Sequence, residues 1–556
     1  MNNAGTDALT LTGAVVSGGG PNEADVRVGD GSVGGAGYTA NVAATLAGAA
    51  RLVKTDLGTL VLSGVNTYAG GTVVKSGTLQ VAQNLNLGAA SGALSLDGGT
   101  LAATASFNTA RAITLGAGNG GINVMGAATD LGVTSAISGS GALTKLGDGS
   151  LTLQADNSYT GGTTISGGIL HLGAGGGGSA TGGILGNVTN NGELVFNRNN
   201  TYTFAGVISG TGSIRQLGSG TTVLTADNSY TGGTTITLGT LQLGEGAGGS
   251  TAGSIVGDVI NRNALVFNRS NTHTYAGVIS GGGSVTQRGN GTTVLSGDNT
   301  YTGGTTIAAG ALQLGAGGST GGIVGNVANS GSLIFNRGNT YTHGGIISGT
   351  GNVVQWGAGT TVLGGVNTYS GGTTVNSGTL QISQDANLGA ASGALSLDGG
   401  TLATTASFNT ARATTLGASG GGINVAASTS FGVTSAIGGS GALSKGGAGT
   451  LALHADNVYA GGTTITAGTL QLGAGAGGSA TGSISGNVAN NGTLAFNRSN
   501  TYTFGGLISG SGGVTQLGNG ATILTANNTY TGGTTITGGV LQLGAGAGGS
   551  TVPAAL

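Results

Sequence analysis

One nine-residue string constrains the fold of this chain more than any other feature. NSYTGGTTI begins at Asn157 and recurs letter for letter at Asn228, and five close variants occur elsewhere in the 556-residue chain. The copies lie roughly 70 or 90 residues apart, a spacing typical of stacked structural units. The residues that define the repeated motif are Asn66, Tyr68, Gly70, Gly71, Asn157, Tyr159, Gly161, Gly162, Asn228, Tyr230, Asn299, Tyr301, Asn367, Tyr369, Asn457, Tyr459, Asn528 and Tyr530.

Within each unit the apolar side chains follow a period of two. Leu151 and Leu153 share one face of a short predicted strand, and Leu241 and Leu243 do the same one unit later. Gly, Asn, Asp or Ser bounds each run, and no window has the pattern of a capped amphipathic helix. These features predict an all-β fold, a right-handed parallel β-helix (a solenoid) that forms a single elongated rod of roughly 24 coils.

Two other all-β architectures also use short strands. A propeller usually carries an aromatic signature in every blade, whereas Trp356 is the single tryptophan of this chain. A β-sandwich would need many hairpins, whereas this repeat continues without a domain break. We therefore expect residues 1–44 to be a divergent segment that forms the first coils, residues 45–552 to be a β-helix of seven repeats, and residues 553–556 to be a truncated tail.

The motif has the composition of a corner between two strands of a coil. An asparagine at its first position tolerates left-handed backbone and can bond to its own backbone. The two glycines allow positive φ where the chain reverses direction, and the Thr-Thr-Ile that follows favours a strand. We expect the tyrosine ring to cover the corner with its hydroxyl in water.

Composition excludes several kinds of partner and site. Only 15 residues are Lys or Arg, and they are scattered, which excludes nucleic acid as a partner. The chain has no cysteine and therefore neither disulfides nor thiolate metal sites. No apolar run approaches the ~18 residues of a membrane helix. We predict no cofactor and no metal.

The histidines stand at repeat positions that other copies fill with glutamine, tyrosine or phenylalanine. We would expect a catalytic histidine in a unique insertion, so we predict no catalytic role for them. They are His171, His273, His343 and His454.

Two rows of charged side chains also recur. Aspartates precede the motif in four copies, and three of them would lie ~14 Å apart, too far for a glycosidase pair. We predict corner hydrogen bonds for the aspartates and no enzymatic activity. Four FNR strings supply an arginine row that we interpret as a solvated face, with a weak contact row for anionic glycans as the alternative. The residues are Asp156, Asp227, Asp298 and Asp456, and Arg198, Arg269, Arg337 and Arg498.

The string GALTKLGDGSLTLQADNSYTGGTTISGGILHLG, from Gly141 to Gly173, closely resembles the autotransporter-associated β-strand repeat. The order and spacing of its residues match over about 30 residues in seven copies, which together cover most of residues 45–550. Three copies have the lysine of the family pattern and four have glutamine instead. These residues are Lys54, Lys145 and Lys445, and Gln216, Gln287, Gln355 and Gln516.

The resemblance implies the surface-exposed passenger of a type V secretion system in Gram-negative bacteria. It implies a right-handed β-helix stalk with a structural and adhesive role, at the cell surface or outer membrane or secreted. The expected partners are host or bacterial surface glycans or proteins, or further copies of the chain. The alternatives are a non-catalytic stalk of a secreted surface enzyme whose catalytic domain lies outside this chain, and a phage-type β-helical fibre.

The family pattern also includes a signal peptide and a C-terminal β-barrel translocator, and we see neither in this sequence. We therefore expect a truncated passenger. Its last coil, around Leu541, would offer unpaired backbone groups, so we expect it to associate end to end or to fray.

Overall fold

A computed structural model describes residues 9–11 and 22–544 of the chain. The chain divides into an N-terminal unit, Met1–Asn271 with Ala276–Val285, and a C-terminal unit, Thr272–Tyr275 with Thr286–Leu556. Both units are built from short strands, three 3-10 helices are present, and no α-helix occurs among the described residues.

Four strands recur in the same order in each of the seven repeats. The first strand is β4 (Arg51–Thr55), β15 (Leu143–Leu146), β23 (Ser213–Gln216), β31 (Ser284–Gln287), β39 (Asn352–Gln355), β50 (Leu443–Gly446) or β58 (Gly513–Gln516). The second is β5 (Thr59–Leu62), β16 (Ser150–Leu153), β24 (Thr221–Leu224), β32 (Thr292–Leu295), β40 (Thr360–Leu363), β51 (Thr450–Leu453) or β59 (Ala521–Leu524).

The third strand follows the Gly-Gly pair of the motif, and the fourth carries the Leu-x-Leu-type pattern. The third is β6 (Thr72–Val74), β17 (Thr163–Ile165), β25 (Thr234–Ile236), β33 (Thr305–Ile307), β41 (Thr373–Val375), β52 (Thr463–Ile465) or β60 (Thr534–Ile536). The fourth is β7 (Thr78–Val81), β18 (Ile169–Leu172), β26 (Thr240–Leu243), β34 (Ala311–Leu314), β42 (Thr379–Ile382), β53 (Thr469–Leu472) or β61 (Val540–Leu543).

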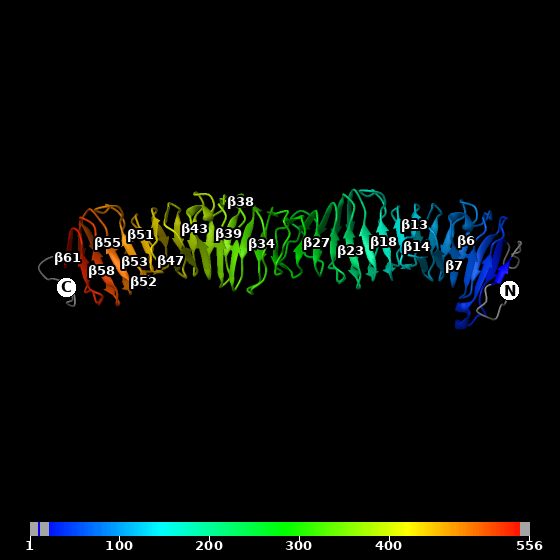
Figure 1. Ribbon diagram of the computed structural model, residues 1–556, viewed down its shortest axis with the longest axis horizontal. Helices are drawn as coiled ribbons and strands as arrows, with labels where there is room; N and C mark the ends of the chain where they lie inside the picture. The colour runs from blue at the N-terminus through cyan, green and yellow to red at the C-terminus, as the bar shows by residue number, and fades with distance from the viewer. Residues whose placement is uncertain (1–8, 12–21, 545–556) are drawn as a thin grey trace. The chain divides into compact units, whose positions relative to one another are not determined.

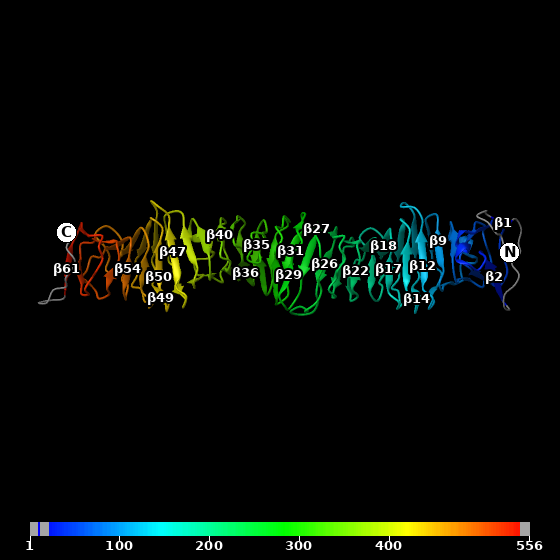
Figure 2. The same cartoon turned by 90° about the horizontal axis from the view of Figure 1, so that it is seen from below.

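In the N-terminal unit the chain returns to the same sheet after visiting the others. Strand β16 pairs in parallel with β13 (Asp130–Val133) on one side and with β18 on the other, while β15 and β17 pair with each other in a different sheet. Figure 1 labels β13 and β18 of the sheet that contains β16. Strands β9 (Thr100–Ala103) and β12 (Gly120–Val124) are likewise neighbours (Figure 2). This is the topology of a parallel solenoid.

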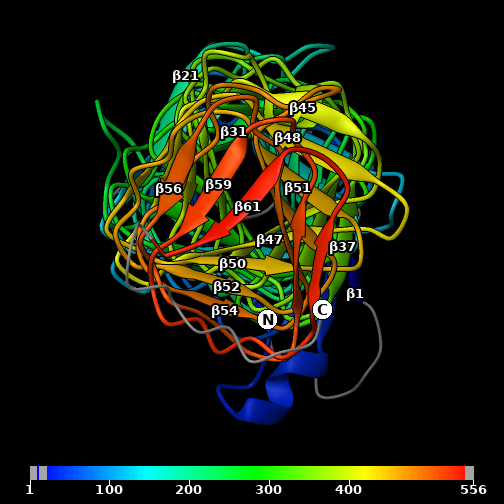
Figure 3. The ribbon, with the colours of Figure 1, turned by 90° about the vertical axis from the view of Figure 1, so that its left-hand side faces the viewer.

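The C-terminal unit repeats this arrangement. Strands β50, β52 and β54 (Val488–Asn490) are consecutive in one sheet, and β56 (Tyr502–Phe504), β59 and β61 form another (Figure 3). The predicted all-β solenoid is confirmed, and its turns number about 25. The propeller and sandwich alternatives do not fit, because the described strand pairs are parallel.

The core consists of apolar side chains stacked in register. Leu131, Leu151, Leu170 and Leu194 follow one another on neighbouring strands, and each is 0% exposed. The period-two pattern predicted this face, because alternate side chains of a strand point to opposite sides.

The ends of the chain bear on three sequence predictions. Strand β1 (Leu9–Leu11) pairs in parallel with β3 (Thr39–Val42). In β61, Leu543 is exposed, whereas Leu243 at the same position of the equivalent β26 is fully buried. The end-to-end association and the three-region division stay predictions, and residues 553–556 lie outside the described residues.

Candidate functional site

The motif asparagine connects three successive turns of the solenoid. In the second repeat, Asn157 Oδ1 accepts from the Ile137 amide at 2.9 Å, and Nδ2 donates to the carbonyls of Ala155 (2.7 Å) and Gly183 (2.8 Å). The sequence predicted bonding of the asparagine to its own backbone; the bond to Ala155 is local, and the other two bonds reach the neighbouring turns. The predicted left-handed backbone is wrong, because the described non-glycine residues with positive φ are Asn22, Asp56, Asn119 and Ser428.

The motif tyrosine is buried, and its hydroxyl bonds to the threonine four residues later. Tyr159 is 0% exposed, and its hydroxyl lies 2.7 Å from Thr163 Oγ1. The prediction of a hydroxyl in water is therefore wrong, because the ring points into the core and the threonine supplies the partner. The seven pairs are Tyr68–Thr72, Tyr159–Thr163, Tyr230–Thr234, Tyr301–Thr305, Tyr369–Thr373, Tyr459–Thr463 and Tyr530–Thr534.

The two motif glycines are needed for different reasons. Gly162 has φ of +80°, as predicted for a corner. Gly161 does not have positive φ, but a Cβ there would lie 2.4 Å from the Ala142 amide nitrogen of the previous turn. The first glycine is thus required by the close approach of two backbones.

The lysine of the first strand is fully buried in three repeats. Lys145 Nζ donates to the carbonyls of Leu146 (2.9 Å), Gly147 (2.8 Å) and Gly167 (3.1 Å). Lys54 and Lys445 each donate to three carbonyls in the same way. Burial lowers the pKa of each of these lysines to about 8.

Glutamine occupies the same position in the other four repeats. Gln216 Nε2 donates to the carbonyls of Gly218 (2.8 Å) and Gly220 (3.3 Å), and its Oε1 accepts from Thr222 Oγ1 at 2.6 Å. The lysine and the glutamine therefore both satisfy buried carbonyl oxygens at a turn. This position stabilises the fold and is not a surface binding site.

The aspartate and arginine rows, which the sequence presents separately, form ion pairs. Arg198 is 5% exposed, and its Nη1 lies 2.9 Å from Asp156 Oδ1. The guanidinium lies 4.5 Å from the centre of the Tyr202 ring. The four pairs are Asp156–Arg198, Asp227–Arg269, Asp298–Arg337 and Asp456–Arg498.

The ion pairs test what the sequence predicted for the aspartate row and for the arginine row. Asp156 Oδ1 accepts from the amides of Gly182 and Gly183, which confirms the predicted corner hydrogen bonds. Burial favours a higher pKa for Asp156, but hydrogen bonds from Arg198 and Gly183 outweigh it and hold the pKa below its usual value. The prediction of a solvated arginine face is wrong, because the guanidinium groups are buried and paired. For the same reason they do not form a contact row for anionic glycans.

Sequence reasoning missed one buried residue in each long repeat. Arg111 is 2% exposed, and it donates to Asn84 Oδ1 at 2.9 Å and to the carbonyls of Gly88 (2.7 Å) and Gly92 (2.9 Å). Arg412 has the same environment, with Asp385 in the place of Asn84. The string SFNTARA, shared by both copies, was the signal that could have found them.

The histidines lie in different environments. His343 is 1% exposed and packs against Phe335, with ring centres 6.1 Å apart, and burial lowers its pKa to about 4. His171 is half-buried and lines an open groove of about 380 Å³ on the N-terminal unit. In residues 9–11 and 22–544, no three His, Cys, Asp or Glu side chains gather closely enough to hold a metal ion.

Comparison with known proteins agrees with this geometry. Segments 52–81, 143–172, 214–243, 285–314, 353–382, 443–472 and 514–543 match the passenger-associated-transport-repeat family. This chain carries seven passenger-associated-transport repeats. Each repeat covers the four strands described above and contains the buried lysine or glutamine, the asparagine, the tyrosine and the two glycines. The resemblance drawn from the sequence is confirmed.

One curated relative is an autotransporter. The chain is 36% identical over 248 residues to the adhesin BmaC autotransporter of Brucella suis biovar 1 (strain 1330). The match covers 45% of this chain and 7% of that protein, so the chain spans a small part of that relative. No solved structure matches the chain significantly. The described helices include none that is long and apolar enough to cross a membrane.

Proposed function

We propose that this chain is part of an autotransporter passenger and acts as a surface-displayed adhesive stalk. The observation that carries the proposal is the stacking of seven passenger repeats whose motif residues are all used inside the solenoid. The named relative is an adhesin, which supports the same role. The chain is located at the cell surface or is secreted, and it has no enzymatic activity of its own.

The outer faces of the strands are the surface available for adhesion. Buried asparagines, tyrosines, lysines and glutamines hold successive turns together, so one side of each strand is committed to the fold. The other side presents small polar side chains along both units, as in β17, where Thr164 lies between buried Thr163 and Ile165. Partners are surface glycans or proteins, or a second copy of the chain.

Adhesion can be measured directly with the purified chain. Beads coated with the chain should bind cultured epithelial cells several-fold more than beads coated with serum albumin. A matched variant lacking residues 214–284 removes one repeat period and should keep most of the binding. Beads that bind no better than albumin would contradict the adhesive role and leave the non-catalytic stalk as the better description.

A further inference from the structure

The groove beside His171 lies on the outer face of one sheet. Its floor is made by β10 (Phe107–Thr109), β13, β16 and β18, which place Asn108, Gly132, Thr152 and His171 side by side in register. The loop Gly173–Gly175 and Asn197 complete the wall, and Gln154 and Asp130 also line the groove. The volume of about 380 Å³ is large enough for a small polar ligand.

A glycine keeps the floor of the groove low. A Cβ at Gly132 would lie 2.0 Å from Asn108 Oδ1 and 3.0 Å from Gln154 Nε2. Because this position has no side chain, the amides of Asn108 and Gln154 can approach each other across the strand. The groove is therefore shaped by the sequence of the strand as well as by the loop beside it.

The groups that line the groove can both donate and accept hydrogen bonds. Asp130 is exposed, and its Oδ1 accepts from Thr152 Oγ1 at 2.8 Å, so the carboxylate is positioned and still has free lone pairs. The side chain of His171 makes no hydrogen bond within the described chain, whereas the side chain of the equivalent Gln242 donates to the Gly244 carbonyl at 2.8 Å. The imidazole is thus available to a ligand.

The second long repeat provides an internal comparison. There the strands keep the same buried leucines, since Leu451, Leu453, Leu470 and Leu472 replace Leu151, Leu153, Leu170 and Leu172. The groove positions differ: Ser430 replaces Asp130, Ala452 replaces Thr152, His454 replaces Gln154, and Gln471 replaces His171. The two copies therefore share their core and differ on this outer face.

We propose that this groove of the N-terminal unit binds a neutral saccharide. Asp130 and Asn108 accept from sugar hydroxyls, and the amide of Gln154 donates to a sugar oxygen. Asp130 is the charged side chain among the described lining residues, and no lysine or arginine lines the groove to receive an anionic sugar. As a docking site for cell-surface glycans this inference rests on the proposed adhesive function, but saccharide binding is tested separately.

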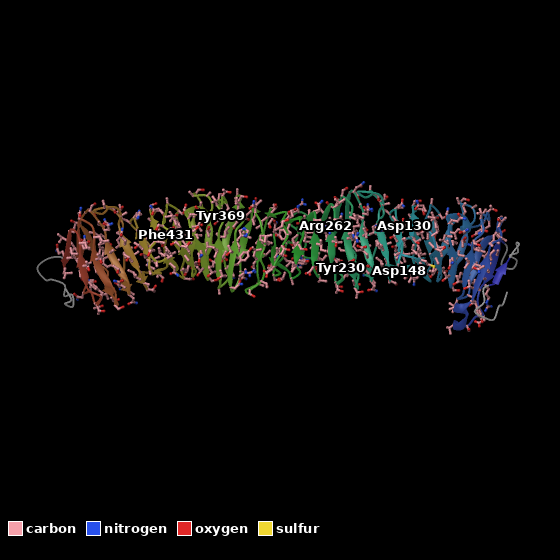
Figure 4. The ribbon with its side chains drawn as sticks, in the orientation of Figure 1. Asp130, Asp148, Tyr230, Arg262, Tyr369 and Phe431 are labelled. Atoms are coloured by element: carbon pink, nitrogen blue, oxygen red, sulfur yellow. The ribbon has the colours of Figure 1, made fainter. Side chains whose placement is uncertain are left out.

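Saturation-transfer NMR on the full chain tests the binding. The probes are the methyl glycosides of glucose, galactose, mannose and N-acetylglucosamine at millimolar concentration, with N-acetylneuraminic acid as the anionic comparison. We expect transfer to at least one neutral glycoside, and about tenfold weaker binding by the double variant Asp130→Ser, Thr152→Ala. The control is Asp148→Ser, which removes an exposed carboxylate at the β15–β16 turn of the same unit and outside the groove lining (Figure 4).

Rebuilding the groove in the second long repeat gives a second test, which depends on a gain of binding and not on its loss. Ser430→Asp, Ala452→Thr, His454→Gln and Gln471→His, introduced into the Asp130→Ser, Thr152→Ala chain, should restore binding. The proposal is overturned by absence of transfer to every neutral glycoside, by stronger transfer to the anionic sugar, or by a double variant that binds like the wild type. If coated beads made with the double variant still adhere fully to cells, the adhesive function stands and the groove is not its site.

Discussion

The lysine-bearing and glutamine-bearing repeats fill the same buried position by different chemistry. The ammonium group of Lys145 donates hydrogen bonds to three carbonyl oxygens. The side chain of Gln216 donates to two carbonyl oxygens, and its own Oε1 needs a donor, which the Thr222 hydroxyl supplies. In all seven repeats, the residue six positions after the lysine or glutamine differs between the two kinds of repeat. It is Leu60, Leu151 or Leu451 after lysine, and Thr222, Thr293, Thr361 or Thr522 after glutamine.

The residue types at the two positions therefore change together. The hydrogen bond between them forms from Thr222 to Gln216 and from Thr293 to Gln287, whereas the Oε1 atoms of Gln355 and Gln516 are buried without a partner. A lysine needs no acceptor partner, so an apolar leucine can follow it in the core. A glutamine placed beside leucine would leave its Oε1 buried and unpaired, which is costly. The titratable lysine also makes one kind of repeat sensitive to pH, while the glutamine makes the other insensitive. The predictions below test this comparison.

The largest effect should come from Lys145→Leu, which leaves three buried carbonyls without a donor. We expect the N-terminal unit to lose about 3 kcal/mol of unfolding free energy. Urea unfolding with hydrogen exchange of the β15 to β18 segment would measure it. Equal protection in the variant and the wild type would show that water replaces the ammonium group.

Lys145→Gln should cost about 2 kcal/mol, because Leu151 offers no hydroxyl to the new Oε1. Adding Leu151→Thr should recover about 1 kcal/mol by creating the Gln216–Thr222 arrangement in a lysine repeat. The matched reverse variants are Thr222→Leu alone and Thr222→Leu with Gln216→Lys. Additive effects in either cycle would contradict the pairing.

Acid should destabilise the segment around His343 more than the equivalent segments around Phe204 and Phe504. Burial lowers the pKa of His343 to about 4, below the usual 6.5, so the unfolded chain binds a proton that the folded chain does not. The stability contribution is complete above pH 6.5 and is lost as the pH falls toward 4. His343→Phe, which copies Phe204 and Phe504, should remove about 1–2 kcal/mol of this loss at pH 4.5. The urea midpoints of the wild type and the variant at pH 7 and pH 4.5 measure this loss. If the midpoint falls between the two pH values by the same amount in both proteins, His343 is not the source of the acid sensitivity.

Alkali should favour the lysine repeats over the glutamine repeats. Their folded pKa of about 8 lies below the usual 10.5, so the unfolded chain holds protons that the folded chain has released between these values. Stability therefore rises as the pH increases from about 8. Above pH 10 it falls again, because burial raises the pKa of Tyr68 and Tyr369 to about 12 and only the unfolded tyrosines ionise.

Urea midpoints between pH 7 and pH 11 would show this maximum. The control has glutamine at the three lysine positions and threonine at the paired leucines. It should lose the rise between pH 8 and pH 10 and keep the fall above pH 10. If the urea midpoint of the control rises between pH 8 and pH 10 as it does in the wild type, the lysines are not the cause of the rise.

The smallest difference between the two kinds of repeat should appear at the tyrosine. Tyr159→Phe and Tyr230→Phe each remove a hydrogen bond to threonine and should each cost about 1 kcal/mol. Because the Tyr–Thr pair is shared by all repeats, the two costs should agree. Hydrogen exchange of β17 and β25 measures them, and a clear inequality would show that the lysine or glutamine affects the tyrosine.

The sequence alone predicted the solenoid, its core faces and its repeated motif. Leu151 and Leu153 could be assigned to the core because alternation along a strand depends only on neighbouring residues. Gly162 was predictable for a similar reason, since positive φ is a local property of the backbone. The passenger-repeat resemblance was also local, because each match falls within a single short stretch of chain.

Only the tertiary structure decided which polar groups meet between turns. Asp156 and Arg198 lie 42 residues apart, and no local pattern shows that they pair. Gly161 is needed because a neighbouring turn comes close, and the Tyr159 hydroxyl is buried because the ring points inward. The groove at Asp130 and His171 likewise depends on four strands and a loop coming together. Stacking of the turns brings together residues that are distant in the sequence, and their separation in sequence depends on the number of residues in each turn.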